Sequence, residues 1–228
     1  MQTIGLLGGM SWVSTQLYYR EINKTIASRL GGAHSAKCLL YSFDFHEIEA
    51  LQSSGEWSTA GNVLGDAAKA LASIGANFIV IGANTMHLVA DDVERISGLP
   101  VLHIGDATAD ALVAAGIKRA ALLGTRYTME KPFIRERIER HGIHVLIPDD
   151  ADRETLHKII YAELIKDVVR QESREDVLDI IERLNANGAQ GIILGCTELE
   201  LLVTPQYTDV PLFRTAEVHA RAAALRAI

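Results

Sequence analysis

Short apolar runs alternate with longer amphipathic segments along the whole chain. The apolar runs have the length of buried strands and cover residues 3–7, 36–43, 78–81, 118–123, 143–147 and 191–194. Shorter runs at 100–102 and near Leu212 predict two further strands. Segments with helical spacing separate them, from Ser11 or Ser14 to Gly31-Gly32, at 58–73, 89–96, 106–115 and 128–140, in two helices across 151–187, and from Ala216 onward. Strands that alternate with helices indicate an α/β protein with parallel sheets.

Part of this pattern occurs twice. Residues 75–85 align with residues 188–198 at a constant spacing of 113 (188 − 75), and Leu6-Leu7-Gly8 resembles Leu122-Leu123-Gly124 at a spacing of 116 (122 − 6). A chance match between buried strands is the alternative, but two agreements at nearly one spacing favour a duplicated half. We therefore predict two similar lobes, with Cys196 and position 83 on opposite walls of one cleft.

Composition and charge exclude several classes of protein. The chain has 228 residues, 48% of them hydrophobic and 22% charged, which is typical of a globular protein. A formal net charge of −7 argues against nucleic acid or an anionic membrane as the main partner. The first residues lack a basic segment, and no apolar stretch approaches the ~20 residues of a membrane helix. With two cysteines, no disulfide framework is implied, so we expect a cytoplasmic protein with free thiols.

Small polar residues follow several predicted strands. The loop Gly8-Gly9-Met10-Ser11 has backbone amides that could receive an anion, although a tight turn is the alternative. Four short hydrogen-bonding side chains could either cap helices or contact a small polar anion. They are Asn84, Thr85, Thr125 and Thr197. His87 could orient a reacting group, or it could be structural. Because His141 and His144 lack the further ligands that zinc requires, we expect no metal.

The two cysteines differ in their setting. Cys38 lies inside an apolar strand, where a free cysteine is usually a small core residue. Cys196 follows the strand 191–194 and Gly195, and it precedes the polar pair Thr197 and Glu198. Ligands of open α/β sheets bind at this end of a strand. A thiolate here could be a nucleophile or a base if its surroundings lower its pKa from about 8.5.

The motifs together resemble the aspartate/glutamate racemase family, whose members work without pyridoxal phosphate. The resemblance covers nearly the whole chain and rests on four motifs: Ile4-Gly5-Leu6-Leu7-Gly8-Gly9-Met10-Ser11, Asn84-Thr85-Met86-His87, Leu122-Leu123-Gly124-Thr125 and Gly195-Cys196-Thr197-Glu198. It implies two pseudo-symmetric α/β lobes with the active site in the cleft between them. The carboxyl-terminal helix of the family packs on the first lobe, which implies lobes at 1–98 plus 215–228 and at 99–214. No cofactor is implied, and a homodimer is common in the family.

The family mechanism uses two thiols. One cysteine removes the α-proton from one face of the amino acid, and a second returns a proton to the other face. Cys196 matches the second cysteine, whereas the position of the first is occupied by Ala83. Ala83 has no proton to transfer, so the residue is either an introduced substitution or part of a one-sided natural enzyme. A single-cysteine decarboxylase of the arylmalonate type, or a pseudoenzyme that binds an amino acid or dicarboxylate, are the other interpretations.

The specificity for the substrate side chain is left open. Aspartate-specific members hold the side-chain carboxylate with an arginine after the second strand and a lysine in the second lobe. The segment 43–48 contains no arginine, whereas Lys166 lies near the expected lysine. Gln52 could contact the side chain instead, and Met10, in the loop whose amides could receive an anion, is a further candidate for substrate binding. His87 and Glu198 are expected to support the site.

Overall fold

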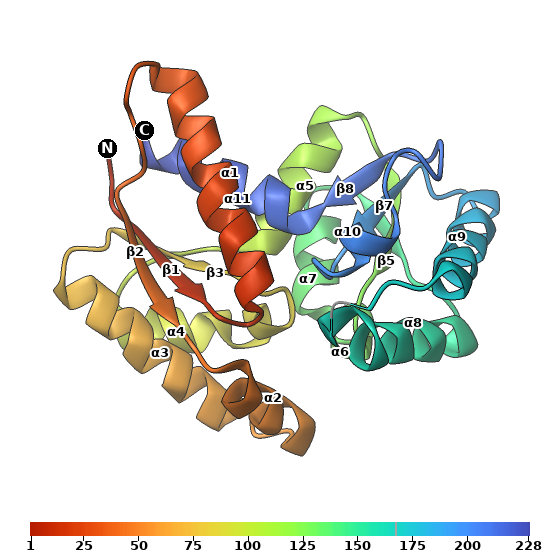
Figure 1. Cartoon of the computed structure of the whole chain (residues 1–228), viewed down its shortest axis with the longest axis horizontal. Coiled ribbons are helices and arrows are strands. Elements are labelled where there is room, and N and C mark those ends of the chain that lie inside the picture. Colours follow the sequence, from red (N-terminus) through yellow and green to blue (C-terminus); the bar gives the residue numbers. More distant parts are fainter. Residues whose placement is uncertain (167) are drawn as a thin grey trace. The chain divides into compact units, whose positions relative to one another are not determined.

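The computed structural model describes residues 1–166 and 168–228. The chain divides into two compact units, which are shown with their elements labelled in Figure 1. The first unit contains Met1–Ile104 and His219–Ile228, and the second contains Gly105–Val218. Within the described residues, no helix is both long enough and apolar enough to cross a membrane.

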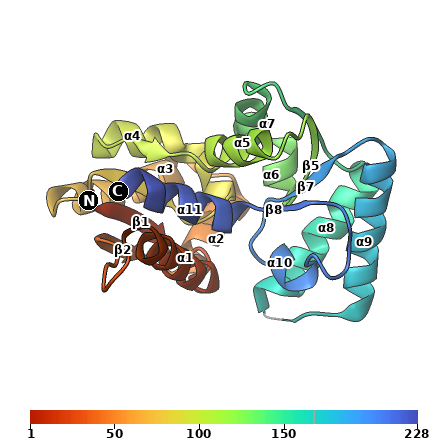
Figure 2. The same ribbon diagram turned by 90° about the horizontal axis from the view of Figure 1, so that it is seen from above.

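The first unit is built on a parallel sheet with strand order β2-β1-β3-β4. Its strands are β1 (Ile4–Gly8), β2 (Cys38–Ser42), β3 (Phe78–Ile81) and β4 (Val101–Leu102). Its helices are α1 (Trp12–Leu30), α2 (Phe45–Ser54), α3 (Trp57–Ser73), the 3-10 helix η1 (Thr85–Val89) and α4 (Ala90–Ser97). Helices α3 and α4 cover one face of this sheet, while α1 lies across the other (Figures 1 and 2).

The second unit repeats this plan with the strand order β6-β5-β7-β8. Its strands are β5 (Arg119–Leu123), β6 (His144–Leu146), β7 (Gly191–Leu194) and β8 (Leu212–Arg214). The helices are α5 (Ile104–Ala114), α6 (Arg126–Glu130), α7 (Pro132–Glu139), α8 (Asp150–Ala162), η2 (Leu164–Lys166), α9 (Gln171–Ala186), α10 (Leu199–Leu202) and α11 (Thr215–Ala227). Helix α11 starts in the second unit and continues into the first. Side chains of α8 and α9 form the core against β5 and β7.

The two sheets confirm the predicted pair of similar α/β lobes. In each sheet the first strand of the unit pairs in parallel with the second and the third, and the third pairs with the fourth. The first residues of β3 and β7, Phe78 and Gly191, stand 113 positions apart (191 − 78), which is the spacing of the sequence repeat. The repeated apolar runs are therefore the central buried strands of two equivalent sheets.

The sequence signals at the ends of α1 act as predicted. Ser11, rather than Ser14, is the N-cap, and its hydroxyl accepts a hydrogen bond from the Ser14 amide at 3.4 Å. The helix ends at Gly31, whose φ of 72° lies in the region that favours glycine.

Cys38, predicted as a core residue, is only partly buried as the first residue of β2, and burial raises the pKa of its thiol to about 11.

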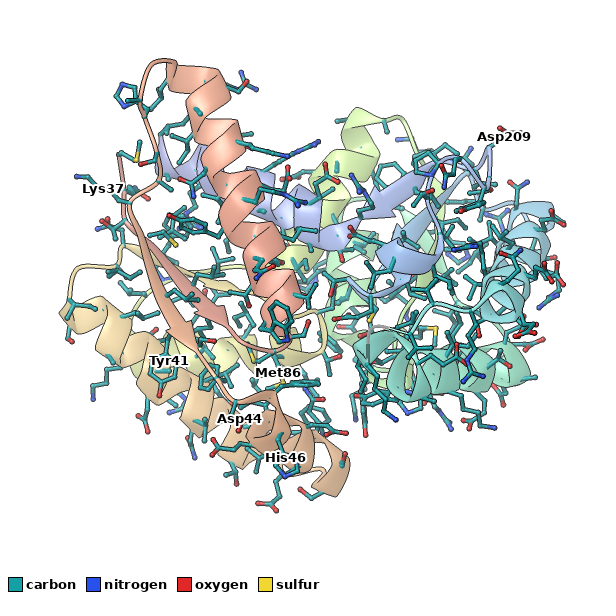
Figure 3. All side chains as sticks on the ribbon, in the orientation of Figure 1. Lys37, Tyr41, Asp44, His46, Met86 and Asp209 are labelled. Carbon is teal, nitrogen blue, oxygen red and sulfur yellow. The ribbon has the colours of Figure 1, made fainter. Side chains whose placement is uncertain are left out.

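The helices of the structure differ from the prediction in two places. The helix expected across 128–140 is broken into α6 and α7, because Pro132 pushes the preceding residue, Lys131, into an extended conformation (φ −82°, ψ 146°). Helix α2 was not predicted at all. It starts from Asp44, whose carboxylate accepts a hydrogen bond from the His46 amide at 3.0 Å, just after β2 ends (Figure 3).

Candidate active site

The loop that follows β7 carries Cys196 to the carboxyl edge of the second sheet. Gly195 opens the loop, and its amide donates a hydrogen bond to the Leu123 carbonyl on β5 at 2.7 Å. A Cβ atom at Gly195 would lie 2.8 Å from that carbonyl oxygen and 3.0 Å from a methyl carbon of Thr128. Glycine is therefore required at position 195 for the close approach of the two strands. This approach fixes the position of the backbone from which Cys196 follows.

One carboxylate oxygen organises the side chains of this loop. The Cys196 thiol donates a hydrogen bond to Oε2 of Glu198 at 3.0 Å, and the Thr197 hydroxyl donates to the same oxygen at 2.8 Å. Cys196 is 9% exposed, whereas Thr197 and Glu198 are partly buried. The three polar residues thus form one local network, which their adjacency in the sequence suggested but did not determine.

The surroundings of Cys196 raise the pKa of its thiol well above the ordinary value. Burial is the largest cause, followed by the negative charge of Glu198 and by the hydrogen bond to it, while the backbone amides of Glu198 and Leu199 act in the opposite direction. The condition set out from the sequence, a lowered pKa, is therefore not met. Because a thiolate and a carboxylate at this distance would repel each other, the negative charge of Glu198 favours the protonated form of the Cys196 thiol.

Thr125 follows β5, the strand beside β7. It is the N-cap of α6, where its hydroxyl accepts a hydrogen bond from the Thr128 amide at 3.3 Å, and it is 6% exposed. The capping interpretation is thus correct for Thr125. Because β5 and β7 are parallel neighbours, Thr125 and Cys196 leave the same edge of one sheet.

The equivalent turn of the first unit follows β3. Gly82 donates its amide to the Leu7 carbonyl at 2.8 Å, as Gly195 does to Leu123 in the second unit. Ala83 comes next and is partly buried, and Asn84 is 7% exposed. Thr85 then begins η1. The two turns are structural counterparts, but the thiol of the second has only a methyl group as its equivalent in the first.

A buried group of histidines lies behind the turn of the first unit. Nδ1 of His87 is 2.8 Å from the Ala83 carbonyl oxygen, and the His87 ring lies edge to face against those of His103 and His219 at centroid distances of 4.7 and 5.4 Å. Nδ1 of His219 is 2.8 Å from the Tyr18 hydroxyl. Sequence reasoning considered His87 alone, since nothing in the chain pairs it with residues so distant in sequence.

The remaining predicted contacts occupy different parts of the fold. In the first unit, Met10 belongs to the apolar core, and the buried Gln52 side chain donates to the sulfur of Met86 at 3.0 Å (Met86 is labelled in Figure 3). In the second unit, Lys166 is exposed at the end of η2. Met10, Gln52 and Lys166 therefore differ widely in their access to solvent.

A cation that the sequence pattern did not indicate lies at the carboxyl edge of the second sheet. Arg214 ends β8 beside Leu194, the last residue of β7. Its guanidinium forms an ion pair with Glu217 and lies 3.9 Å from a carboxylate oxygen of Glu200, a side chain that is 6% exposed. Among the residues with a described position, no group of three or more His, Cys, Asp or Glu side chains is arranged to hold a metal ion.

Known proteins resemble this chain over most or all of its length. A family model described as Asp/Glu/hydantoin racemase matches residues 7–223. The crystal structure of a provisionally named Asp/Glu racemase from Yersinia pestis has a TM-score of 0.93 at 54% identity and covers 100% of this chain and 99% of its own. That of an aspartate racemase homologue from Pyrococcus horikoshii OT3 has a TM-score of 0.85 at 34% identity, with coverage of 100% and 99%. A broad specificity amino-acid racemase from Bacillus subtilis (strain 168) is 23% identical over 156 residues, 68% of this chain and 67% of the relative.

Proposed function

We propose that this chain, which belongs to the Asp/Glu/hydantoin racemase family, is a racemase-type isomerase that moves the α-proton of aspartate or glutamate through Cys196 without pyridoxal phosphate. The observation that carries the proposal is the hydrogen bond of 3.0 Å between the Cys196 thiol and Glu198 at the carboxyl edge of β7. The names of two full-length relatives, at 54% and 34% identity, support the choice of acidic amino acids.

In the proposed reaction Glu198 is the base that activates Cys196. Glu198 accepts the thiol proton as the amino acid binds, and the thiolate then removes the α-proton. An S–H bond forms as the C–H bond breaks, and the electron pair moves onto the substrate's α-carboxylate. The thiol returns a proton to carbon, and Glu198 returns its proton to sulfur when the product leaves. General acid–base groups of this kind contribute roughly 10²–10⁴-fold to a rate.

Hydrogen-bond donors for the substrate carboxylate are the second part of the proposal. The charge on the carboxylate increases when the α-proton leaves, so fixed donors around it stabilise the transition state more than the bound substrate. We assign this role to Thr125 and Thr197 in the second unit and to Asn84 and Thr85 in the first. The Thr125 hydroxyl accepts from the Thr128 amide, which supports a preorganised arrangement, whereas the Thr197 hydroxyl donates to Glu198 and would have to exchange that partner for the substrate.

Ala83 makes the proposed chemistry one-sided. Its methyl group cannot donate or accept a proton, so Cys196 would exchange the α-proton of one enantiomer faster than that of the other, and return of the proton to the opposite face would fall to water or another group. The same observation favours a second candidate, a single-cysteine decarboxylase of the arylmalonate type. There, loss of carbon dioxide leaves a carbanion that one thiol protonates.

Recognition of the substrate side chain is assigned to Lys166, Gln52 and Met10. Lys166 can supply the positive charge that a side-chain carboxylate needs. Gln52 donates to the sulfur of Met86, a weak acceptor, so its amide can exchange that partner for a carboxylate. If the enzyme accepts neutral amino acids equally well, it recognises only the α-amino and α-carboxylate groups, and these three residues do not select the side chain.

The test is product analysis with a panel of substrates. The wild-type chain and Cys196→Ser are incubated with L- and D-aspartate, L- and D-glutamate, L-alanine and a disubstituted malonate. Chiral chromatography follows enantiomers, and released carbon dioxide follows decarboxylation. Slow conversion of an acidic amino acid that is lost in Cys196→Ser supports the proposal. Carbon dioxide release from the malonate without amino-acid conversion would replace it with the decarboxylase.

A further inference from the structure

The hydrogen bond between His87 and Ala83 fixes where the proton of the imidazole resides. A carbonyl oxygen can only accept, so Nδ1 of His87, 2.8 Å from the Ala83 oxygen, must carry the hydrogen. In the neutral ring Nε2 is then a bare acceptor. This atom is buried, and no donor among the described residues reaches it. Burial lowers the pKa of His87 well below its ordinary value, and His103 and His219 lower it further. The ring is therefore neutral, with one nitrogen committed to Ala83.

A second hydrogen-bonded histidine supports the first. Nε2 of His219 lies 2.7 Å from the Leu102 carbonyl oxygen and so carries the proton, which leaves Nδ1 to accept from the Tyr18 hydroxyl at 2.8 Å. These bonds tie α11 to β4 and α1. The His219 ring contacts His87 on one side, and His103, which directly follows β4, contacts it as well. His87 is consequently packed against two rings, and hydrogen bonds fix the position of one of them, His219.

The hydrogen bond between His87 and the Ala83 carbonyl also determines the direction in which the backbone N–H of Asn84 points. The peptide bond between Ala83 and Asn84 is trans, because the cis bond among the described residues joins Met10 and Ser11. In a trans peptide the C=O and the N–H point in opposite directions. Since the Ala83 carbonyl points at His87, the N–H of Asn84 points away from the histidine group. This turn leaves the carboxyl end of β3, the edge at which open α/β sheets bind ligands.

We propose that His87 is a positioning residue: its hydrogen bond to the Ala83 carbonyl turns the backbone N–H of Asn84 toward the substrate's α-carboxylate. His103 and His219, the latter bonded to Tyr18, hold the His87 ring in place. The inference rests on the proposed function. The Asn84 amide strengthens its hydrogen bond as charge develops on the carboxylate, so it acts mainly in the transition state. His87 itself does not touch the substrate and transfers no proton.

Two substitutions separate this role from simple filling of space. His87→Asn keeps an N–H donor at the place of Nδ1, whereas His87→Leu has a similar volume near the backbone and no donor. The rate of α-proton exchange is measured for both, with their unfolding midpoints as the check on folding. We expect His87→Asn to stay within about threefold of the wild type and His87→Leu to lose roughly 10²-fold in kcat, the scale of one lost oxyanion donor, with little change in KM. Equal losses in two folded variants, or none in either, would overturn the inference.

Nitrogen NMR gives a readout that does not depend on turnover. The ¹⁵N shifts of the imidazoles should show the proton of His87 on Nδ1 and that of His219 on Nε2, and the reverse assignment for His87 would contradict the proposal. If the wild-type chain exchanges no α-proton, the proposed function fails, and the inference is decided by titration with L-aspartate. A shift of the Asn84 amide in the wild type and in His87→Asn, but not in His87→Leu, supports it. An amide that does not respond in the wild type refutes it.

Discussion

The sulfur of Cys196 lies 3.0 Å from a carboxylate oxygen of Glu198, to which the thiol donates a hydrogen bond. This relationship reverses the usual expectation for a reactive cysteine, whose neighbours lower its pKa. A protonated thiol beside a carboxylate is suited to reversible transfer of one proton, since the carboxylate can accept it and later give it back. Nucleophilic attack would require a thiolate that persists, and the charge of Glu198 works against that.

Removal of the negative charge of Glu198 should lower the pKa of Cys196. Glu198→Gln keeps an oxygen that accepts from the thiol but removes the charge that repels the thiolate. Burial still raises the pKa, so the value should fall without returning to that of an exposed thiol. The measurement is the pH dependence of the rate at which iodoacetamide alkylates Cys196, made in a Cys38→Ser background so that Cys196 is the remaining thiol. An unchanged or higher pKa would show that Glu198 does not control the thiol.

Glycine should matter more at 195 than at the equivalent position 82. A Cβ atom at Gly195 would meet the Leu123 carbonyl oxygen at 2.8 Å and a Leu122 methyl group at 2.9 Å. At Gly82 the nearest atom, the Leu7 carbonyl oxygen, is 3.1 Å away. We therefore expect Gly195→Ala to cost about 1–3 kcal/mol of unfolding free energy and to displace the Cys196 loop, with a smaller loss for Gly82→Ala. Urea denaturation of both variants gives the comparison, and a larger loss for Gly82→Ala would contradict it.

The buried histidines should make the fold sensitive to acid. Burial lowers the pKa of His219 from 6.5 to about 4. Above the unfolded value the residue is neutral in both states. As the pH falls from there toward about 4, only the unfolded chain takes up the proton, so the free energy of unfolding decreases. The titration of His219 alone lowers the free energy of unfolding by about 3 kcal/mol when the pH has fallen to about 4.

The variant His219→Gln isolates this contribution. Carboxylates that are paired in the folded state also weaken acid stability, but they do so equally in the wild type and in the variant. Urea unfolding across the acid range should therefore show a shallower dependence on pH in His219→Gln than in the wild type. Two parallel curves would mean that His219 titrates alike in the folded and unfolded states.

Restoring a thiol at position 83 should make the proposed reaction two-sided. Ala83→Cys supplies a group that can transfer a proton where the methyl group of Ala83 cannot. We expect racemisation of the favoured amino acid to increase by at least tenfold, within the range for a general acid–base group. The matched control is Ala83→Ser, whose hydroxyl has a similar size but is a far weaker acid than a thiol. A similar gain from both variants would attribute the effect to polarity at position 83 rather than to an acid/base.

The sequence predicts the framework of the candidate site well because the framework is local. The apolar run before Gly195 has a length and boundaries that fit a buried strand, and β7 occupies residues 191–194 as predicted. The repeat at a spacing of 113 then identifies β3 as its counterpart. Helix α2 was missed although Asp44 is a preferred N-cap residue, and the break before Pro132 was missed in a segment whose periodicity looks continuous.

The chemistry was less predictable, because it depends on contacts that the sequence does not display. His87, His103 and His219 come from separate elements, and only the fold brings their rings together. Glu198 stands two residues after Cys196, but the sequence does not show that its carboxylate turns back to the thiol. The direction of the Cys196 pKa shift follows from that one side-chain orientation together with burial.

The most direct test of the account is α-proton exchange in deuterium oxide. Proton NMR follows the α-signal of L-aspartate, D-aspartate, L-glutamate and D-glutamate, each incubated separately with the wild-type chain or with Cys196→Ser. If Cys196 moves the α-proton from one face, deuterium should enter one enantiomer of an acidic amino acid faster than the other, and Cys196→Ser should abolish the exchange. The absence of exchange from all four amino acids, or exchange that persists in Cys196→Ser, would contradict it.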